Sequence, residues 1–148
     1  SVVKKFSVTV DQDFEAVMRA CGNPDRESGW INEDVISAFT ALHQMGVAHS
    51  IEVWDSEGRL AGGLYGIELG GVFAGESMFH VTKNASKVAL VHLGQLLNDG
   101  SGRIIDTQWM TSHLESMGAK PIDRADYCRL LPQLLAIPPI LSRLTGRP

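Results

Sequence analysis

The sequence predicts an α+β protein in which helices flank a central mixed sheet, and two observations lead to this. Stretches of alternating apolar residues, which are typical of strands, are separated by segments whose apolar residues recur at helical spacing. Three strand-like stretches follow one another directly, and a strand, helix, strand, helix order comes after them. At 148 residues, the chain has the length of one domain with a single core.

The first expected elements are a strand over 6–10 and a helix that Asp11 caps. A polar loop with Gly and Pro follows over 21–29. Asn32 is a good N-cap for a second helix, which carries an apolar stripe and ends at Gly46.

A three-stranded antiparallel meander is expected next, over 50–54, 60–69 and 72–79. Gly58 supplies the positive φ of the first hairpin turn, and Gly70 with Gly71 makes the second turn.

The remaining expected elements are a helix over 84–97, a strand over 103–107, a short helix over 112–118, a short strand over 120–122, and a helix that Asp123 caps and that ends near Leu131. The inward-facing residues expected on the first of these helices are Val88, Leu90, Val91, Leu93 and Leu97. We therefore expect one domain over 1–131 and an irregular C-terminal tail over 132–148.

Two acidic residues stand inside strand-like stretches, Glu76 in the third strand of the meander and Asp106 in the next strand. A carboxylate among apolar neighbours must reach a polar cavity or lose several kcal/mol of hydration. Asp106 and Gln108 are two residues apart, so both point to one face of their strand, as do Glu76 and Met78. From spacing alone, a buried Asp–Gln pair and a salt bridge from Glu76 to Lys87 or Arg103 remain alternatives to a site.

Composition excludes several classes of function. The net charge of −4 gives no whole-domain basic surface for nucleic acid, although five basic and two acidic residues lie in 118–148. No apolar run reaches the ~18–20 residues of a membrane helix, and two cysteines suit a reducing cytoplasm. The five histidines show no metal-binding spacing, and neither Ser77 nor the cysteines form a nucleophile motif. We expect no metal, no cofactor and no membrane partner.

The order of elements resembles that of acyl-CoA N-acyltransferase-like domains. Those enzymes hold pyrophosphate on a glycine-rich turn that opens the helix after the fourth strand. Here that position, 82–87, contains no glycine, so backbone amides approach a pyrophosphate less closely.

Seven ordered segments resemble the leucyl/phenylalanyl-tRNA-protein transferase family: Trp30–Ile31, Ala48–Trp54, Gly62–Gly66, Phe73–Phe79, Asn84–Lys87, Ile105–Gln108 and His113–Ala119. The resemblance covers about 6–131 and corresponds to the family's C-terminal, acyltransferase-like domain. It implies transfer of Leu or Phe from aminoacyl-tRNA to a protein with N-terminal Arg or Lys, which marks that protein for degradation. The family's N-terminal domain has no counterpart before Ser1, so we expect a fragment, a processed form or a shortened relative, with weakened binding of intact tRNA.

The resemblance also implies roles for individual residues. It makes Asp106 and Gln108 the catalytic pair and places Trp30 near the 3′ adenosine. Two roles at the site stay open for Glu76: it holds the incoming Arg or Lys side chain, or it organises the mouth of the pocket through hydrogen bonds. The implied pocket for the Leu or Phe side chain consists of Leu64, Phe73, Leu90, Leu93, Leu97 and Ile105. Pattern alone favours ordinary core packing for each of them, so their assignment to the pocket rests on the resemblance.

Two other functions stay open, a CoA-dependent N-acetyltransferase and a binding-only fragment that recognises basic N-termini. The oligomeric state, the preference between Leu and Phe, and the protein substrates are not encoded in any recognisable pattern.

Overall fold

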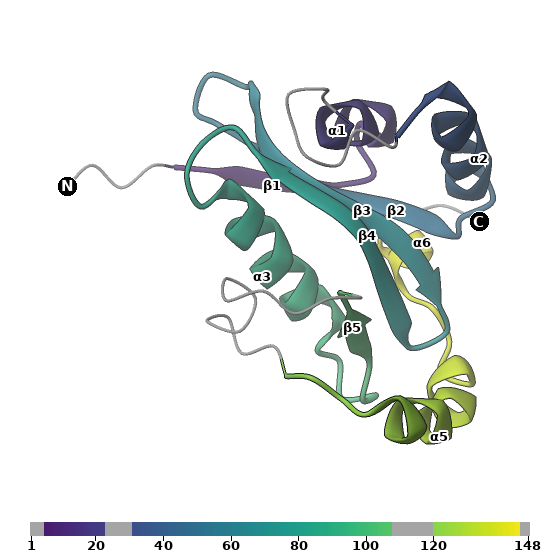
Figure 1. The fold of residues 1–148 in the computed structure, drawn as a ribbon. Coiled ribbons are helices and arrows are strands. Elements are labelled where there is room, and N and C mark those ends of the chain that lie inside the picture. Colours follow the sequence, from purple (N-terminus) through teal and green to yellow (C-terminus); the bar gives the residue numbers. More distant parts are fainter. Residues whose placement is uncertain (1–4, 23–30, 108–119, 146–148) are drawn as a thin grey trace.

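The computed structural model describes residues 5–22, 31–107 and 120–145. One five-stranded sheet runs through the molecule in the order β1-β2-β3-β4-β5 (Figure 1). The strands are β1 (Ser7–Val10), β2 (Ala48–Trp54), β3 (Leu60–Leu69), β4 (Val72–His80) and β5 (Ile104–Asp106). The first four pair antiparallel, and β5 pairs parallel to β4. The expected meander and mixed sheet are confirmed.

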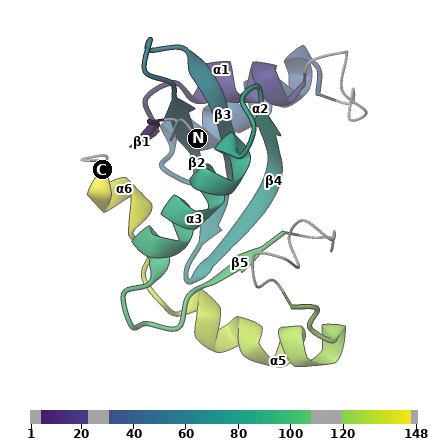
Figure 2. The same ribbon diagram turned by 90° about the vertical axis from the view of Figure 1, so that its left-hand side faces the viewer.

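Helices cover both faces of the sheet (Figures 1 and 2). The two on one face are α1 (Phe14–Cys21) and α2 (Glu33–Gln44), and α3 (Ala85–Leu97) packs on the other. Two further helices, α5 (Arg124–Leu135) and α6 (Leu141–Leu144), complete the described chain. None of the helices in these ranges has the length and hydropathy of a membrane span.

The core is divided by the sheet into two clusters. The cluster under α1 and α2 contains Phe14, Val17, Met18, Ile36, Tyr65 and Phe79. The cluster under α3 contains Ile51, Val53, Leu64, Phe73, Leu93 and Leu141. Because neighbouring strand residues point to opposite faces, Leu64 and Tyr65 belong to different clusters.

Asp11 does not cap α1, and that prediction is wrong. The N-cap is Asp13, whose Oδ1 accepts a hydrogen bond from the backbone N–H of Ala16 at 3.2 Å. The Asp11 carboxylate instead accepts from the backbone N–H of Ser50 at 2.9 Å and lies 2.7 Å from His49 Nδ1. The Asp11 side chain therefore makes a tertiary contact instead of the helix cap that the local pattern predicts.

Other local predictions are confirmed. Asn32 caps α2 through a 3.0 Å bond from Val35 N, and Gly46, just past the helix, has φ +78°. Gly58 has φ +78° in the β2–β3 turn.

On α3, Val91 is 51% exposed, so its expected inward orientation is wrong. Residues 120–122 form no strand, and the helix expected over 112–118 lies outside the described residues.

The end of the chain differs from the expected irregular tail. Instead of ending near Leu131, α5 continues to Leu135 with Pro132 inside it, and α6 follows. Leu141 is completely buried in the α3-side cluster. The Glu68 carboxylate accepts hydrogen bonds from the backbone N–H groups of Ile140 and Leu141, both at 3.1 Å. This segment is thus part of the core.

The turn between β3 and β4 organises its neighbours. Gly70 has φ +56°, and a Cβ there would lie 2.5 Å from the carbonyl oxygen of Leu135. Gly71 donates its N–H to the carbonyl of Leu134 at 2.7 Å, and its own carbonyl accepts from the N–H of Ile104 at 2.9 Å. A two-glycine turn thus joins the end of α5 to the start of β5.

A buried carboxylate also joins β1 to β2. Glu52 is fully buried and accepts hydrogen bonds from the Thr9 hydroxyl at 2.6 Å, from the backbone N–H of Gln12 at 3.0 Å, and from the Ser50 hydroxyl. Burial raises the pKa of Glu52, while these hydrogen bonds lower it.

Substitution of Gly70 tests the docking of α5. Gly70→Ala should lower the free energy of unfolding by more than the ~1–2 kcal/mol that a positive φ alone costs, because the added methyl meets the Leu135 backbone. Gly58→Ala is the matched control, since Gly58 also has positive φ but a Cβ there would meet no atom within 4 Å. Urea denaturation of both variants measures the difference, and equal losses would contradict the docking contact.

The pH dependence of unfolding tests Glu52. Because its folded pKa is raised above the ordinary value of 4.5, its contribution to stability is complete below that value and is lost as the pH rises through the folded pKa. We compare the free energy of unfolding of the natural protein with that of Glu52→Gln. The difference, natural protein minus variant, should therefore fall as the pH rises above about 4.5. The total fall should be ~1.4 kcal/mol for each pH unit by which folding raises the pKa of Glu52. Glu57→Gln, at an exposed carboxylate of the β2–β3 turn, should give a difference without this trend.

Candidate functional site at the end of a parallel strand pair

The two strand acids lie where β4 and β5 stop pairing. The parallel register joins Val72 to Ile104, Phe73 to Ile105, and finally Ala74 to Asp106. Beyond this pair β4 continues to His80, whereas β5 ends at Asp106 (Figure 2). Asp106 thus stands at the end of β5, and Glu76 lies two residues past the last residue of β4 that pairs with β5. Both are partly buried.

The register of β3 and β4 shifts at Glu76. Tyr65 pairs with Ser77 and Gly66 pairs with Gly75, so Glu76 is the extra residue of a bulge in β4. A bulge of this kind bends a strand and redirects a side chain. The shared face of Glu76 and Met78 was predicted from strict alternation, which the bulge interrupts, so that prediction loses its basis.

Asp106 is held by a residue that sequence reasoning missed. The hydroxyl of Tyr127, on α5, donates a hydrogen bond to Asp106 Oδ2 at 3.0 Å. Burial, and then the neighbouring carboxylate, raise the pKa of Tyr127 to about 12. The helical stripe on α5 indicates which side packs inward, but no sequence pattern shows that this hydroxyl reaches β5.

The predicted pocket residues meet in one place. Those buried within the α3-side cluster are Leu64, Phe73, Leu93 and Leu97, and Leu90 and Ile105 pack against the cluster while partly exposed. Ile105 precedes Asp106 directly, so this apolar cluster adjoins the strand end that carries the acid. Whether any of the six contacts a substrate stays a prediction.

Two predicted site residues, Trp30 and Gln108, lie outside the described residues. For Glu76, one of the two alternative salt-bridge partners is engaged elsewhere. Arg103 pairs with Asp99, with Nε and Oδ2 3.1 Å apart.

The buried histidines contribute to structure. His49 lies between Asp11 and the carbonyl of Gly46, with Nε2 to oxygen at 3.0 Å, and the ring of His43 stacks on Phe14 at 4.4 Å. Within residues 5–22, 31–107 and 120–145, no group of three or more His, Cys, Asp or Glu residues is arranged to hold a metal ion.

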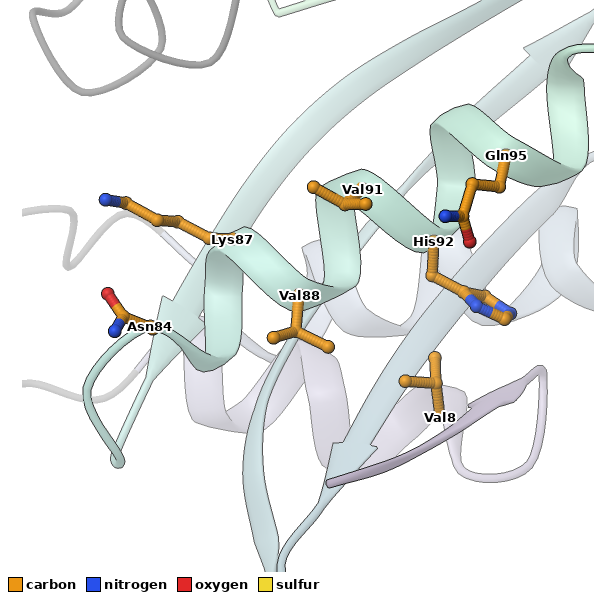
Figure 3. A pocket seen from close by; sticks show the side chains of 7 residues that line it. All are labelled: Val8, Asn84, Lys87, Val88, Val91, His92 and Gln95. Carbon is orange, nitrogen blue, oxygen red and sulfur yellow. The ribbon is translucent and has the colours of Figure 1, made fainter. Parts of the chain in front are cut away.

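A groove that neither strand acid lines lies between α3 and β1 (Figure 3). In the close-up, Val88 and His92 of α3 point toward Val8 of β1. The groove has a volume of about 270 Å³, and the residues that line it are Val8, Asn84, Lys87, Val88, Val91, His92 and Gln95. None of the six residues of the predicted side-chain pocket is among them, so the groove is distinct from that pocket.

The fold and the strand acids together define an α+β protein with an acidic site at the end of a parallel strand pair. Residues 2–132 match the family model described as leucyl/phenylalanyl-tRNA protein transferase. The chain belongs to this family.

Curated relatives agree with the family match, and the three described here are each named leucyl/phenylalanyl-tRNA–protein transferase. The relative from Rubrobacter xylanophilus is 52% identical over 132 residues, which are 89% of this chain and 68% of the relative. The relative from Nitrosomonas europaea is 50% identical over 90% of this chain and 57% of its own length, and the one from Maricaulis maris is 51% identical over 88% and 61%. The chain thus spans between about half and two-thirds of the length of these relatives.

Substitution of Tyr65 tests the packing on the sheet face opposite to α3. Its side chain is fully buried between Phe14 and Phe39, and its hydroxyl has no hydrogen-bond partner among the described residues. Burial raises the pKa of Tyr65. Tyr65→Phe removes an unpaired buried polar atom, so the free energy of unfolding should stay equal or rise by ~1 kcal/mol. A loss above ~1 kcal/mol in urea denaturation would show that the hydroxyl is bonded in solution.

Proposed function

We propose that the protein is an aminoacyltransferase that moves Leu or Phe from aminoacyl-tRNA to the N-terminal Arg or Lys of a protein and so marks that protein for degradation. The observation that carries the proposal is the placement of Asp106 at the end of β5, directly after Ile105 of the α3-side apolar cluster, with Glu76 two residues past the last β4 residue that pairs with β5. Family membership supports the same reaction.

The reaction needs little chemical activation. The donor is already an activated ester, and the neutral amino group of the acceptor attacks its carbonyl carbon. A C–N bond forms, the ester C–O bond breaks, the amine loses a proton, and the ribose oxygen gains one. Holding the reacting atoms ~3–3.5 Å apart can itself lower the barrier by ~7–11 kcal/mol.

Asp106 suits the acceptor's amino group. Its carboxylate lies at a strand end and is oriented by Tyr127, so it can hold the amine by hydrogen bonds and take part in removing its proton. We assign Gln108 to the same reacting centre from the family resemblance, as a hydrogen-bonding partner, because a neutral amide is too weak a base to take the proton itself.

Glu76 suits the cationic side chain of the acceptor. A partly buried carboxylate attracts a guanidinium or an ammonium group more strongly than an exposed one, because less water screens the charges. We also assign Trp30 to the 3′ adenosine of the donor by resemblance alone.

The apolar cluster suits the Leu or Phe side chain of the donor. Its buried members, Leu64, Phe73, Leu93 and Leu97, form the base of the pocket, and the partly exposed Leu90 and Ile105 are placed to contact the donor first.

We further propose that the fold is acyl-CoA N-acyltransferase-like. Support comes from the parallel β4–β5 pair, which ends after three residue pairs, and from the bulge beside it. The helix that follows β4 begins after Asn84, and no glycine precedes it in the turn from 81. Recognition of a CoA pyrophosphate is therefore less favoured than recognition of an aminoacyl ester. Because aminoacyl-tRNA is the proposed donor, we also propose that the protein works in the cytoplasm.

The proposal is tested with phenylalanyl-adenosine as a minimal donor and an Arg-starting peptide as the acceptor. Asp106→Asn should lower kcat by about 10²-fold or more, because the amine loses its orienting carboxylate.

Glu76→Gln should raise KM for the peptide about tenfold through loss of a charge-assisted bond. The preference of the Glu76→Gln variant for a peptide that starts with Arg over one that starts with the neutral isostere citrulline should disappear. Mass spectrometry of the peptide measures transfer, and Asp34→Asn, at an exposed carboxylate on α2, is the control.

The same assay separates the other functions. Acetyl transfer from acetyl-CoA to the peptide would replace the proposal with an N-acetyltransferase. Peptide binding without transfer from either donor would indicate a binding-only protein. Transfer from phenylalanyl-adenosine, but not from Phe-tRNA, would show a working site whose hold on tRNA depends on residues beyond this chain.

A further inference from the structure

The bond between Tyr127 and Asp106 joins two elements that are distant in sequence. Asp106 ends β5, and Tyr127 lies 21 residues later on α5, yet the hydroxyl and Oδ2 are 3.0 Å apart. A carboxylate at the end of a short strand has freedom about its side-chain torsions. One fixed donor restricts that freedom and selects an orientation.

The position of Tyr127 is set by the docking of α5. Leu134 lies seven residues after Tyr127, so the two share one face of the helix. Leu134 is buried, and its carbonyl accepts the hydrogen bond from Gly71. The N–H of Ile104, at the start of β5, binds the carbonyl of the same glycine. The glycine turn therefore fixes both partners, the strand with the acid and the helix with the hydroxyl.

The hydroxyl is a donor at ordinary pH. Burial and the neighbouring carboxylate raise the pKa of Tyr127 to about 12, so the phenol keeps its proton. The bond therefore runs from the Tyr127 hydroxyl to Oδ2 of Asp106.

We propose that Tyr127 is a positioning residue whose hydroxyl holds the Asp106 carboxylate in the orientation that receives the acceptor's amino group. This inference rests on the proposed function. Tyr127 acts through Asp106 and need not touch either substrate. The helix α5 is thereby part of the site, because it supports a side chain of β5 rather than only covering the sheet.

The test is a double-mutant cycle in the transfer assay with phenylalanyl-adenosine and an Arg-starting peptide. Tyr127→Phe removes only the hydroxyl and should lower kcat by about 10- to 100-fold with little change in KM for the donor, because misorientation affects the reacting geometry. In the Asp106→Asn background, the same substitution should change kcat by less than about twofold. A purely structural role of the hydroxyl predicts equal losses in both backgrounds.

A second measurement does not need turnover. Calorimetry with the Arg-starting peptide should show weaker binding to Tyr127→Phe than to the natural protein, and equal binding to Asp106→Asn with or without Tyr127→Phe. Asp126→Asn is the matched control, because it alters an exposed neighbour on α5 that pairs with Arg129. Thermal melting establishes that each variant is folded.

The outcomes separate the two proposals. Unchanged kcat and peptide affinity in Tyr127→Phe, in a chain whose natural form is active, would overturn the positioning role and leave the proposed function intact. Equal losses in both backgrounds would overturn it as well. A natural chain that neither transfers the amino acid nor binds the peptide would overturn the proposed function, and the role of Tyr127 with it.

Discussion

The contact of the β3–β4 turn with the end of α5 is the constraint on which the site depends. Gly70 allows the backbone of Leu135 to approach more closely than any side chain would permit, and Gly71 uses both of its backbone polar groups to bind α5 and β5. The strand acid and the tyrosine that binds it thus share one anchor. A change at this turn would act on Asp106 without altering any residue near it.

Buried carboxylates connect parts of the chain that are far apart in sequence, and each accepts backbone N–H groups. Asp11 binds Ser50, Glu52 binds Gln12, and Glu68 binds Ile140 and Leu141. Backbone donors are fixed by the fold, so such bonds need no long basic side chain to be immobilised. These acids account for part of the acidic excess of the sequence without implying a basic partner.

Much of the fold could be predicted because alternation and helical spacing are local signals. The meander, α2, α3 and β5 follow from them, whereas the errors arise where tertiary contacts override local pattern. Asp11 and Asp13 suit an N-cap equally until β2 binds the first, and Pro132 indicates a helix end until the docking of Leu134 is known.

The candidate site was predictable to a similar degree. The two acids stand out in apolar strands, but the bulge at Glu76 depends on the register of β3, and the contact of Tyr127 with Asp106 depends on how α5 docks.

The order of the strands along the sheet also bears on folding kinetics. Short turns join β2 to β3 and β3 to β4, so the meander can form through short loop closures. The bonds from Glu68 to Ile140 and Leu141 span 72 and 73 residues and carry a larger closure entropy. During refolding, the C-terminal segment should therefore join a sheet that has already formed.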